Sequence, residues 1–162
     1  MKLKTTELAL FGILGGLMFA LKVAMMSLPN IEPVSLLVML YAVLFGRKAV
    51  WPISVYILLE FALYGLNLWS VSYLYIWFLL ASAAWYLRDM QSPLGWGLLS
   101  GTFGLLFGAL CTPVCLFTGG FAYALSWWVS GIPFDLIHCA ANFVIALVLF
   151  CPLRRLGKRL YH

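Results

Sequence analysis

Apolar residues fill most of this chain in long runs, and polar residues gather in short breaks between the runs. A helix needs roughly 20 apolar residues to cross the hydrocarbon core of a bilayer, and shorter helices occur where neighbours bury them. Three breaks, at 28–33, 45–48 and 88–93, are rich in proline, glycine or charged residues. The pattern predicts a single all-α domain, 1–162, with six transmembrane helices near 7–27, 33–46, 49–66, 69–87, 93–116 and 132–153.

The composition also indicates an integral membrane protein that sits in a lipid bilayer. Hydrophobic residues make up 65% of the chain and charged residues 9%, which leaves too little polar surface to cover a soluble globule. The net charge of +5 does not indicate a nucleic-acid partner, because the cations lie at helix ends rather than in one surface patch.

The cations predict how the helices are oriented. Nine of the ten lysines and arginines fall on one side of a six-helix arrangement, and Lys22 is the exception. Loops that carry an excess of Lys and Arg face the cytoplasm, so both termini are predicted to be cytoplasmic. Glu32, Glu60 and Asp135 fall in the opposite, outer half. We therefore expect an acidic cavity that opens outward.

The segment 131–155 carries a polar arc on an otherwise apolar helix. Asp135, His138 and Asn142 lie within about 60° of one another at 100° per residue. Polar groups are costly in lipid unless they meet partners or water. The arc is therefore predicted to face the interior of the bundle or a cavity.

Aromatic residues line up with an acid on the predicted helices 49–66 and 69–87. Tyr56, Glu60 and Tyr64 are spaced at i, i+4 and i+8, and Trp69, Tyr73 and Trp77 repeat that spacing. An acid between rings suits a flat or cationic organic molecule. The alternative, an aromatic belt at the membrane interface, does not explain Glu60, which needs a partner such as Lys22 or His138.

Small residues mark two further segments. Gly12, Gly16, Ala20 and Ala24 form a stripe on the first predicted helix, which suits either packing inside the bundle or a surface for a partner protein. The glycines of 93–116 suit either tight helix packing or local flexibility. The stretch 117–128 is broken by Gly119-Gly120 and is expected to form either a lid, that is, a short interfacial helix hinged at these glycines and covering the pocket, or an ordinary loop against the membrane.

The motifs of several enzyme classes are missing. The chain has no GxxxxGK[ST] phosphate loop, no GxSxG elbow, no HExxH and no CxxC pair, and its four cysteines are interpreted as small buried apolar residues. No metal and no cofactor are expected. Two alternatives remain open: a small intramembrane enzyme that uses Asp135 and His138 as an acid–base pair, and a structural bundle without a ligand.

The chain resembles the substrate-binding S component of energy-coupling factor (ECF) transporters. The resemblance covers essentially the whole chain and rests on Pro29-Asn-Ile-Glu-Pro33, on Phe45-Gly-Arg-Lys48, and above all on Gly131-Ile-Pro-Phe-Asp135 with His138, Asn142-Phe143 and Pro152-Leu153.

This resemblance implies six helices, an outward pocket, and a complex with a coupling transmembrane subunit and two ATPase subunits in a bacterial plasma membrane. It implies that the chain is not itself an enzyme, since the partner subunits hydrolyse ATP, and that it topples in the membrane to release its ligand. It also implies that Ala20 and Ala24 contact the coupling subunit.

The expected ligand is a small heteroaromatic vitamin or related micronutrient, neutral or cationic. A phosphate group would need arginines, and none lies in the outer half. A thiamin-like, pyridoxine-like or deazapurine-like molecule fits this description. His138 is expected either to donate to a ring nitrogen or to hold Asp135 in place. The predicted substrate-binding residues are Asn30, Glu32, Tyr56, Glu60, Tyr64, Trp69, Tyr73, Trp77, Asp135, His138 and Asn142.

Overall fold

The computed structural model describes residues 3–28 and 30–161, and within those ranges it contains helices and no strands. The predicted all-α class is therefore confirmed. The helices are α1 (Thr5–Ala24), α2 (Val34–Phe45), the 3₁₀ turn η1 (Gly46–Ala49), α3 (Val50–Tyr64), α4 (Leu68–Tyr86) and α5 (Pro93–Tyr161).

The number of separate spans differs from the prediction. Four helical stretches in the described ranges are long and apolar enough to cross a membrane, and six are not supported. The predicted helices 33–46 and 49–66 fall in one such stretch, because only η1 stands between α2 and α3. The predicted helices 93–116 and 132–153 both belong to α5, because the connecting segment is helical too. The four stretches are Thr5–Ala24, Val34–Tyr64, Leu68–Tyr86 and Pro93–Tyr161.

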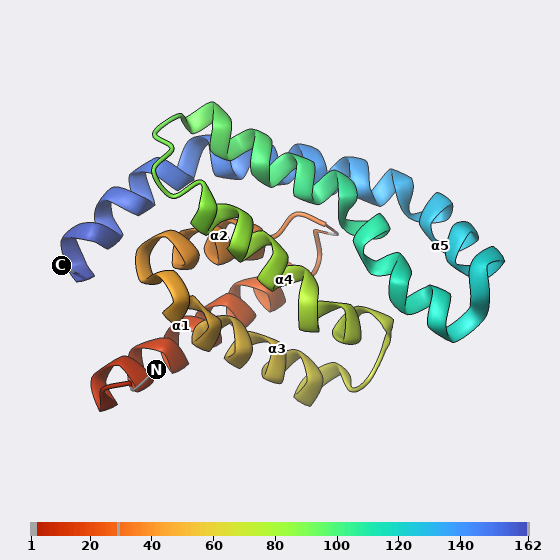
Figure 1. Cartoon of the computed structure of the whole chain (residues 1–162), viewed down its shortest axis with the longest axis horizontal. Coiled ribbons are helices and arrows are strands. Elements are labelled where there is room, and N and C mark those ends of the chain that lie inside the picture. Colours follow the sequence, from red (N-terminus) through yellow and green to blue (C-terminus); the bar gives the residue numbers. More distant parts are fainter. Residues whose placement is uncertain (1–2, 29, 162) are drawn as a thin grey trace.

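Helix α5 is bent back on itself at Gly120. This residue has φ 78° and ψ −179°, a conformation that glycine adopts far more readily than other residues. The first arm, 93–119, and the second arm, 121–161, lie side by side (Figure 1). The segment 117–128, expected to be either a short helix hinged at Gly119-Gly120 or an ordinary loop, is helical on both sides of Gly120 and forms the bend of this hairpin.

Glycines of the first arm make the close contact between the arms possible. A Cβ atom at Gly104 would lie 2.8 Å from the carbonyl oxygen of His138, and one at Gly101 would lie 3.1 Å from Cβ of Phe143. Without side chains at these positions, the helix backbones approach closely, as small residues allow in membranes. The predicted role of these glycines in tight packing is confirmed.

Helix α2 is the most deeply buried helix of the bundle, in contact with α1, α4 and α5. Nine consecutive residues of α2, from Val34 to Ala42, are buried, which matches a helix that is apolar on all sides. Helices α4 and α5 pack on α2 and on each other, and α1 packs on α3. A Cβ at Gly15 would lie 2.6 Å from Cβ of Val55, so the absence of a side chain at Gly15 lets α1 approach α3.

Charged groups join the N-terminal part of α1, η1 and the end of α5 at one end of the bundle. Lys48 forms an ion pair with Glu7, and the Tyr161 hydroxyl donates to the same carboxylate at 3.2 Å. The Arg154 guanidinium donates to the Met90 carbonyl oxygen at 2.7 Å, which ties the second arm of α5 to the α4–α5 connection. We call this the basic end.

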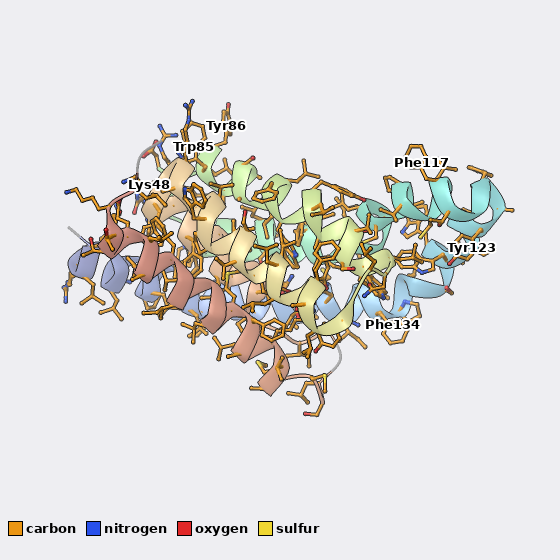
Figure 2. All side chains as sticks on the ribbon, turned by 90° about the horizontal axis from the view of Figure 1, so that it is seen from below. Lys48, Trp85, Tyr86, Phe117, Tyr123 and Phe134 are labelled. Carbon is orange, nitrogen blue, oxygen red and sulfur yellow. The ribbon has the colours of Figure 1, made fainter. Side chains whose placement is uncertain are left out.

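Figure 2 shows the two ends of the bundle in one view. Lys48, Trp85 and Tyr86 lie at the basic end, and the hairpin of α5 with Phe117 and Tyr123 projects at the opposite end.

Candidate functional site

A cavity of about 410 Å³ lies at the end of the bundle opposite the basic end. Its volume falls within the roughly 300–1,000 Å³ that small-molecule pockets occupy. The wall combines charged side chains, aromatic rings and the connection between α1 and α2. Seven of the predicted substrate-binding residues line it, namely Asn30, Glu32, Glu60, Tyr64, Trp69, Tyr73 and His138.

An ion pair stands in the wall of this cavity. The Lys22 ammonium group donates to Oε2 of Glu60 at 2.6 Å and to the hydroxyl of Tyr73 at 3.3 Å. Glu60 is only 3% exposed, and a carboxylate so deeply buried needs a partner of opposite charge. The prediction that Glu60 needs a partner is confirmed, and of the two candidates Lys22 fills the role. Three helices, α1, α3 and α4, are joined at this point.

Tyrosine rings surround the same ammonium group. The Lys22 nitrogen lies 5.0 Å from the ring centroid of Tyr73, 5.5 Å from that of Tyr64 and 6.0 Å from that of Tyr56. These distances suit cation–π attraction. The arrangement of an acid among rings was predicted to hold a ligand, and in the structure the ammonium group of the chain's own lysine lies beside that acid and those rings.

Two predicted site residues, Tyr56 and Trp77, support the wall from behind and are not among the lining residues. Both are completely buried, and their ring centroids lie 6.2 Å and 5.2 Å from that of Tyr73. In the spacing i, i+4, i+8, each successive side chain points in a slightly different direction and lies farther along the helix. Tyr56 and Trp77 are the members farthest from the mouth of the cavity, and they do not line it. Their contacts fix the ring of Tyr73, so their contribution to a ligand is indirect.

The outer wall is aromatic. Trp69 packs against Phe107 with centroids 6.1 Å apart and against Trp127 with centroids 5.0 Å apart. These contacts join α4 to both arms of α5. Phe134 adds a further ring from the second arm (Figure 2). A flat molecule in the cavity therefore has ring faces within reach from α4 and from α5.

The polar arc of α5 is buried, as predicted, but its members have different partners. Asp135 accepts a hydrogen bond from the backbone N–H of Gly108 at 3.1 Å. Asn142 donates to the Ser35 hydroxyl at 3.0 Å, which connects α5 to α2. Neither Asp135 nor Asn142 lines the cavity, so the prediction of direct ligand contact is not supported for these two residues. Their side chains hold the arms of α5 and α2 together.

His138 is the member of the arc that reaches the cavity. It is 2% exposed, and neither ring nitrogen has a hydrogen-bond partner among the described residues. Its ring packs edge-on against Phe107 at 4.9 Å. It makes no bond to Asp135, so the expectation that it holds that carboxylate in place is not supported. A buried imidazole without partners is costly, and a polar ligand group at the cavity wall is able to satisfy it.

The same geometry bears on the enzyme alternative. Asp135 and His138 form no hydrogen bond with each other: Oδ1 of Asp135 accepts from the backbone N–H of Gly108, and neither ring nitrogen of His138 has a partner among the described residues. Among residues 3–28 and 30–161, no three His, Cys, Asp or Glu side chains are grouped as a metal site requires.

Several lining residues were not predicted from the sequence. Asn67 and Ser70 form the capping box of α4, and the Asn-x-x-Ser spacing is a signal that identifies such a cap. Phe107 faces the cavity only because of the register between the two arms of α5, and no local pattern reveals that register. The other lining residues outside the predicted set are Lys22, which was expected only as a partner of Glu60, and Met25, Met26, Leu28 and Phe134.

The small-residue stripe of α1 faces away from the bundle. Cβ atoms placed on Gly12 or Gly16 would meet nothing within 4 Å, and Ala20 and Ala24 are exposed. The neighbouring Gly15, which was not part of the predicted stripe, makes the close contact with α3 instead. Of the two interpretations left open by the sequence, packing inside the bundle is therefore excluded for these four residues within the chain itself.

Comparisons with protein-family models, with curated proteins and with solved structures found no match.

Proposed function

We propose that this chain is the substrate-binding membrane subunit of an ECF-type, ATP-driven importer, and that it captures a small heteroaromatic vitamin or related micronutrient from outside the cell. The observation that supports this most directly is the cavity of about 410 Å³, with aromatic walls and an internal ion pair, at the end of the bundle opposite the basic end. A pocket of this kind suits the binding of one small ligand per chain.

The proposed orientation follows from the cations. The basic end faces the cytoplasm by the positive-inside rule, so the cavity opens to the outside. If α2 and α3 cross the membrane separately, and the two arms of α5 do the same, the chain crosses it six times. Each terminus is then cytoplasmic, in a bacterial plasma membrane. A glycosylation or cysteine-labelling map that places residues 117–123 in the cytoplasm contradicts this orientation.

The proposed partners are a coupling transmembrane subunit and two ATPase subunits. The stripe of Gly12, Gly16, Ala20 and Ala24 is available on the outside of α1, where a second transmembrane helix is able to approach closely. Hydrolysis of ATP is assigned to the separate subunits.

Co-purification tests the assembly. When the chain is expressed with ECF coupling and ATPase subunits, we expect it to be recovered with them. Replacing Ala20 with Phe is expected to abolish recovery and to leave ligand binding intact. Ile13→Phe is the matched control, because Ile13 is a large exposed residue of α1 outside the stripe. Failure of the unmodified chain to assemble, where a known S component succeeds, argues against the proposal.

Calorimetry tests ligand capture. The purified chain is titrated with a panel of vitamins and nucleobases, including thiamin, pyridoxine and deazapurines. We expect one heteroaromatic compound to bind at a stoichiometry of one per chain. Turnover of the bound compound by the isolated chain supports the enzyme alternative instead, and the absence of any binding compound supports the structural one.

A further inference from the structure

The two carboxylates that line the cavity differ in their partners. Glu60 is paired with Lys22 at 2.6 Å. Glu32 is not: among residues 3–28 and 30–161 the salt bridges are Lys22–Glu60 and Lys48–Glu7. Asp135, the third acid of the outer half in the sequence, is not among the lining residues. The cavity therefore holds two acids and one lysine, and Glu32 carries the negative charge that remains unpaired.

The position of Glu32 is set by the backbone on both sides. Asn30, two residues before it, has φ 60°, and Pro33, directly after it, is the N-cap of α2. The connection between α1 and α2 thus brings the carboxylate to the cavity wall together with Asn30.

Other groups in the wall also lack partners. Both ring nitrogens of His138 and Oε1 of Glu60 are buried without a hydrogen bond in the described part of the chain. Trp69 and Phe107 present ring faces beside them. The wall therefore offers aromatic surface for a flat body, polar atoms for its heteroatoms and one carboxylate for a charge.

We propose that the cavity binds a flat aromatic molecule that carries one positive charge, and that Glu32 is the carboxylate that pairs with this charge. The inference rests on the proposed ligand-binding function and narrows its ligand class from neutral or cationic to monocationic. A cation at Glu60 would have to displace Lys22 and leave an ammonium group without its carboxylate. A cation at Glu32 displaces nothing and balances the charges of the cavity.

The electrostatics of Glu32 agree with this assignment. Burial raises the pKa of the Glu32 carboxyl to about 7. The attraction of Lys22 opposes this shift, and the nearby negative charge of Glu60 adds to it. Without a ligand, the cavity therefore disfavours a second negative charge, that of ionised Glu32, near the carboxylate of Glu60. An anionic ligand meets the same resistance, because it has to compete with Glu60 for Lys22.

Three probes of similar shape and different charge test the proposal. 1-Methylnicotinamide, which is methylated on the ring nitrogen, is a cation, nicotinamide is neutral and nicotinate is an anion. Binding to the purified chain is measured by calorimetry at pH 8 and up to millimolar concentrations. We expect the cation to bind about tenfold or more tightly than nicotinamide, and nicotinate to bind least.

Variants test whether Glu32 is the residue that pairs with the positive charge of the ligand. Glu32→Gln is expected to remove the preference for the cation, and Glu32→Asp to keep most of it. Asp89→Asn is the control, because it removes an exposed carboxylate near the basic end and should leave binding unchanged. Circular dichroism and size-exclusion profiles check that each variant is folded.

Three results overturn the inference: no binding of the cation, equal or tighter binding of nicotinamide or nicotinate, or an unchanged preference in Glu32→Gln. These results do not by themselves decide the proposed importer function, which other measurements test. If a neutral vitamin binds and the chain assembles with its coupling partners, the importer subunit stands and the monocation assignment is discarded.

Discussion

Replacing Lys22 with Met is the most informative perturbation of the bundle. The substitution keeps the length and most of the volume of the side chain but removes the ammonium group. The carboxylate of Glu60 loses its partner at 2.6 Å, and the hydroxyl of Tyr73 loses a donor at 3.3 Å. Glu60 is then a buried acid with no opposite charge, in a position that is only 3% exposed.

The expected cost follows from that burial. Breaking a buried pair by removing one partner typically costs 3–5 kcal/mol, mostly because the remaining charge is stranded. The Lys22 side chain is 20% exposed towards the cavity, so water solvates part of the site after the change. We therefore expect Lys22→Met to lower the free energy of unfolding by about 3 kcal/mol, at the lower end of that range.

The double variant Lys22→Met, Glu60→Leu tests the mechanism. It removes both charges, and replacing a buried pair by apolar residues is often close to neutral. We expect it to be more stable than Lys22→Met alone, so that the pair of substitutions is not additive. Lys48→Met is the control, because its pair with Glu7 is more exposed and should matter little.

The free energy of unfolding is measured by equilibrium unfolding in mixed micelles of SDS and a mild detergent, with tryptophan fluorescence as the signal. If Lys22→Met is as stable as the unmodified chain, or if the double variant is the least stable of the set, the reasoning about the buried pair is refuted.

Three further predictions concern the arms of α5, the charge of Glu32 and the wall of the cavity. Gly104→Val places a side chain against the His138 carbonyl and is expected to cost about 1–3 kcal/mol of unfolding free energy in the same assay, whereas Gly12→Ala, which meets nothing, should cost little. Equal stability of the two variants would contradict the packing of the arms. Because folding raises the pKa of Glu32 from 4.5 to about 7, the contribution of this group to stability should be fully present below pH 4.5 and be lost as the pH rises through about 7. Glu32→Gln should flatten that part of the profile, and an unchanged profile would contradict the assignment. His138→Phe should weaken binding of the ligand found by calorimetry about tenfold or more without loss of folding, because the imidazole nitrogens lack partners in the described chain. Unchanged affinity would show that the ligand does not use the imidazole.

The general character of the fold could be predicted from the sequence because it depends on composition and on local pattern. Long apolar runs indicate membrane helices, and an acid such as Glu60 in an apolar run signals a partner wherever it lies. The glycines of 93–116 likewise signal close packing whatever their neighbour is. Each of these conclusions needs only the chemistry of a residue and its immediate surroundings.

The details that failed depend on three-dimensional register. For the stretch 117–128 the sequence left a short hinged helix and a loop open, and it did not show that a single residue, Gly120, reverses the chain while helical conformation continues on both sides. Asp135 and His138 share one face of α5, yet their surroundings differ. Asp135 lies against Gly108 of the first arm, whereas His138 lines the cavity. No spacing within one helix reveals which residue of the facing helix lies opposite.

Lys22 shows a similar limit. In the sequence it interrupts the small-residue stripe of α1 and departs from the distribution of the other cations. In the structure it points to the side of α1 that faces α3 and α4, and it becomes the central charge of the site. The sequence allowed its pairing with Glu60, but the tyrosines that surround its ammonium group come from two other helices.

Binding of the vitamin and nucleobase panel to the purified chain in lipid nanodiscs tests the central claim most directly. The proposal predicts that one heteroaromatic compound binds with a stoichiometry of one. Binding should be lost when Met25, in the cavity wall, is replaced by Trp, and retained when the exposed Val144 is replaced by Trp. Absence of binding by every compound, or tight binding that survives Met25→Trp, would contradict the claim that this cavity captures the ligand.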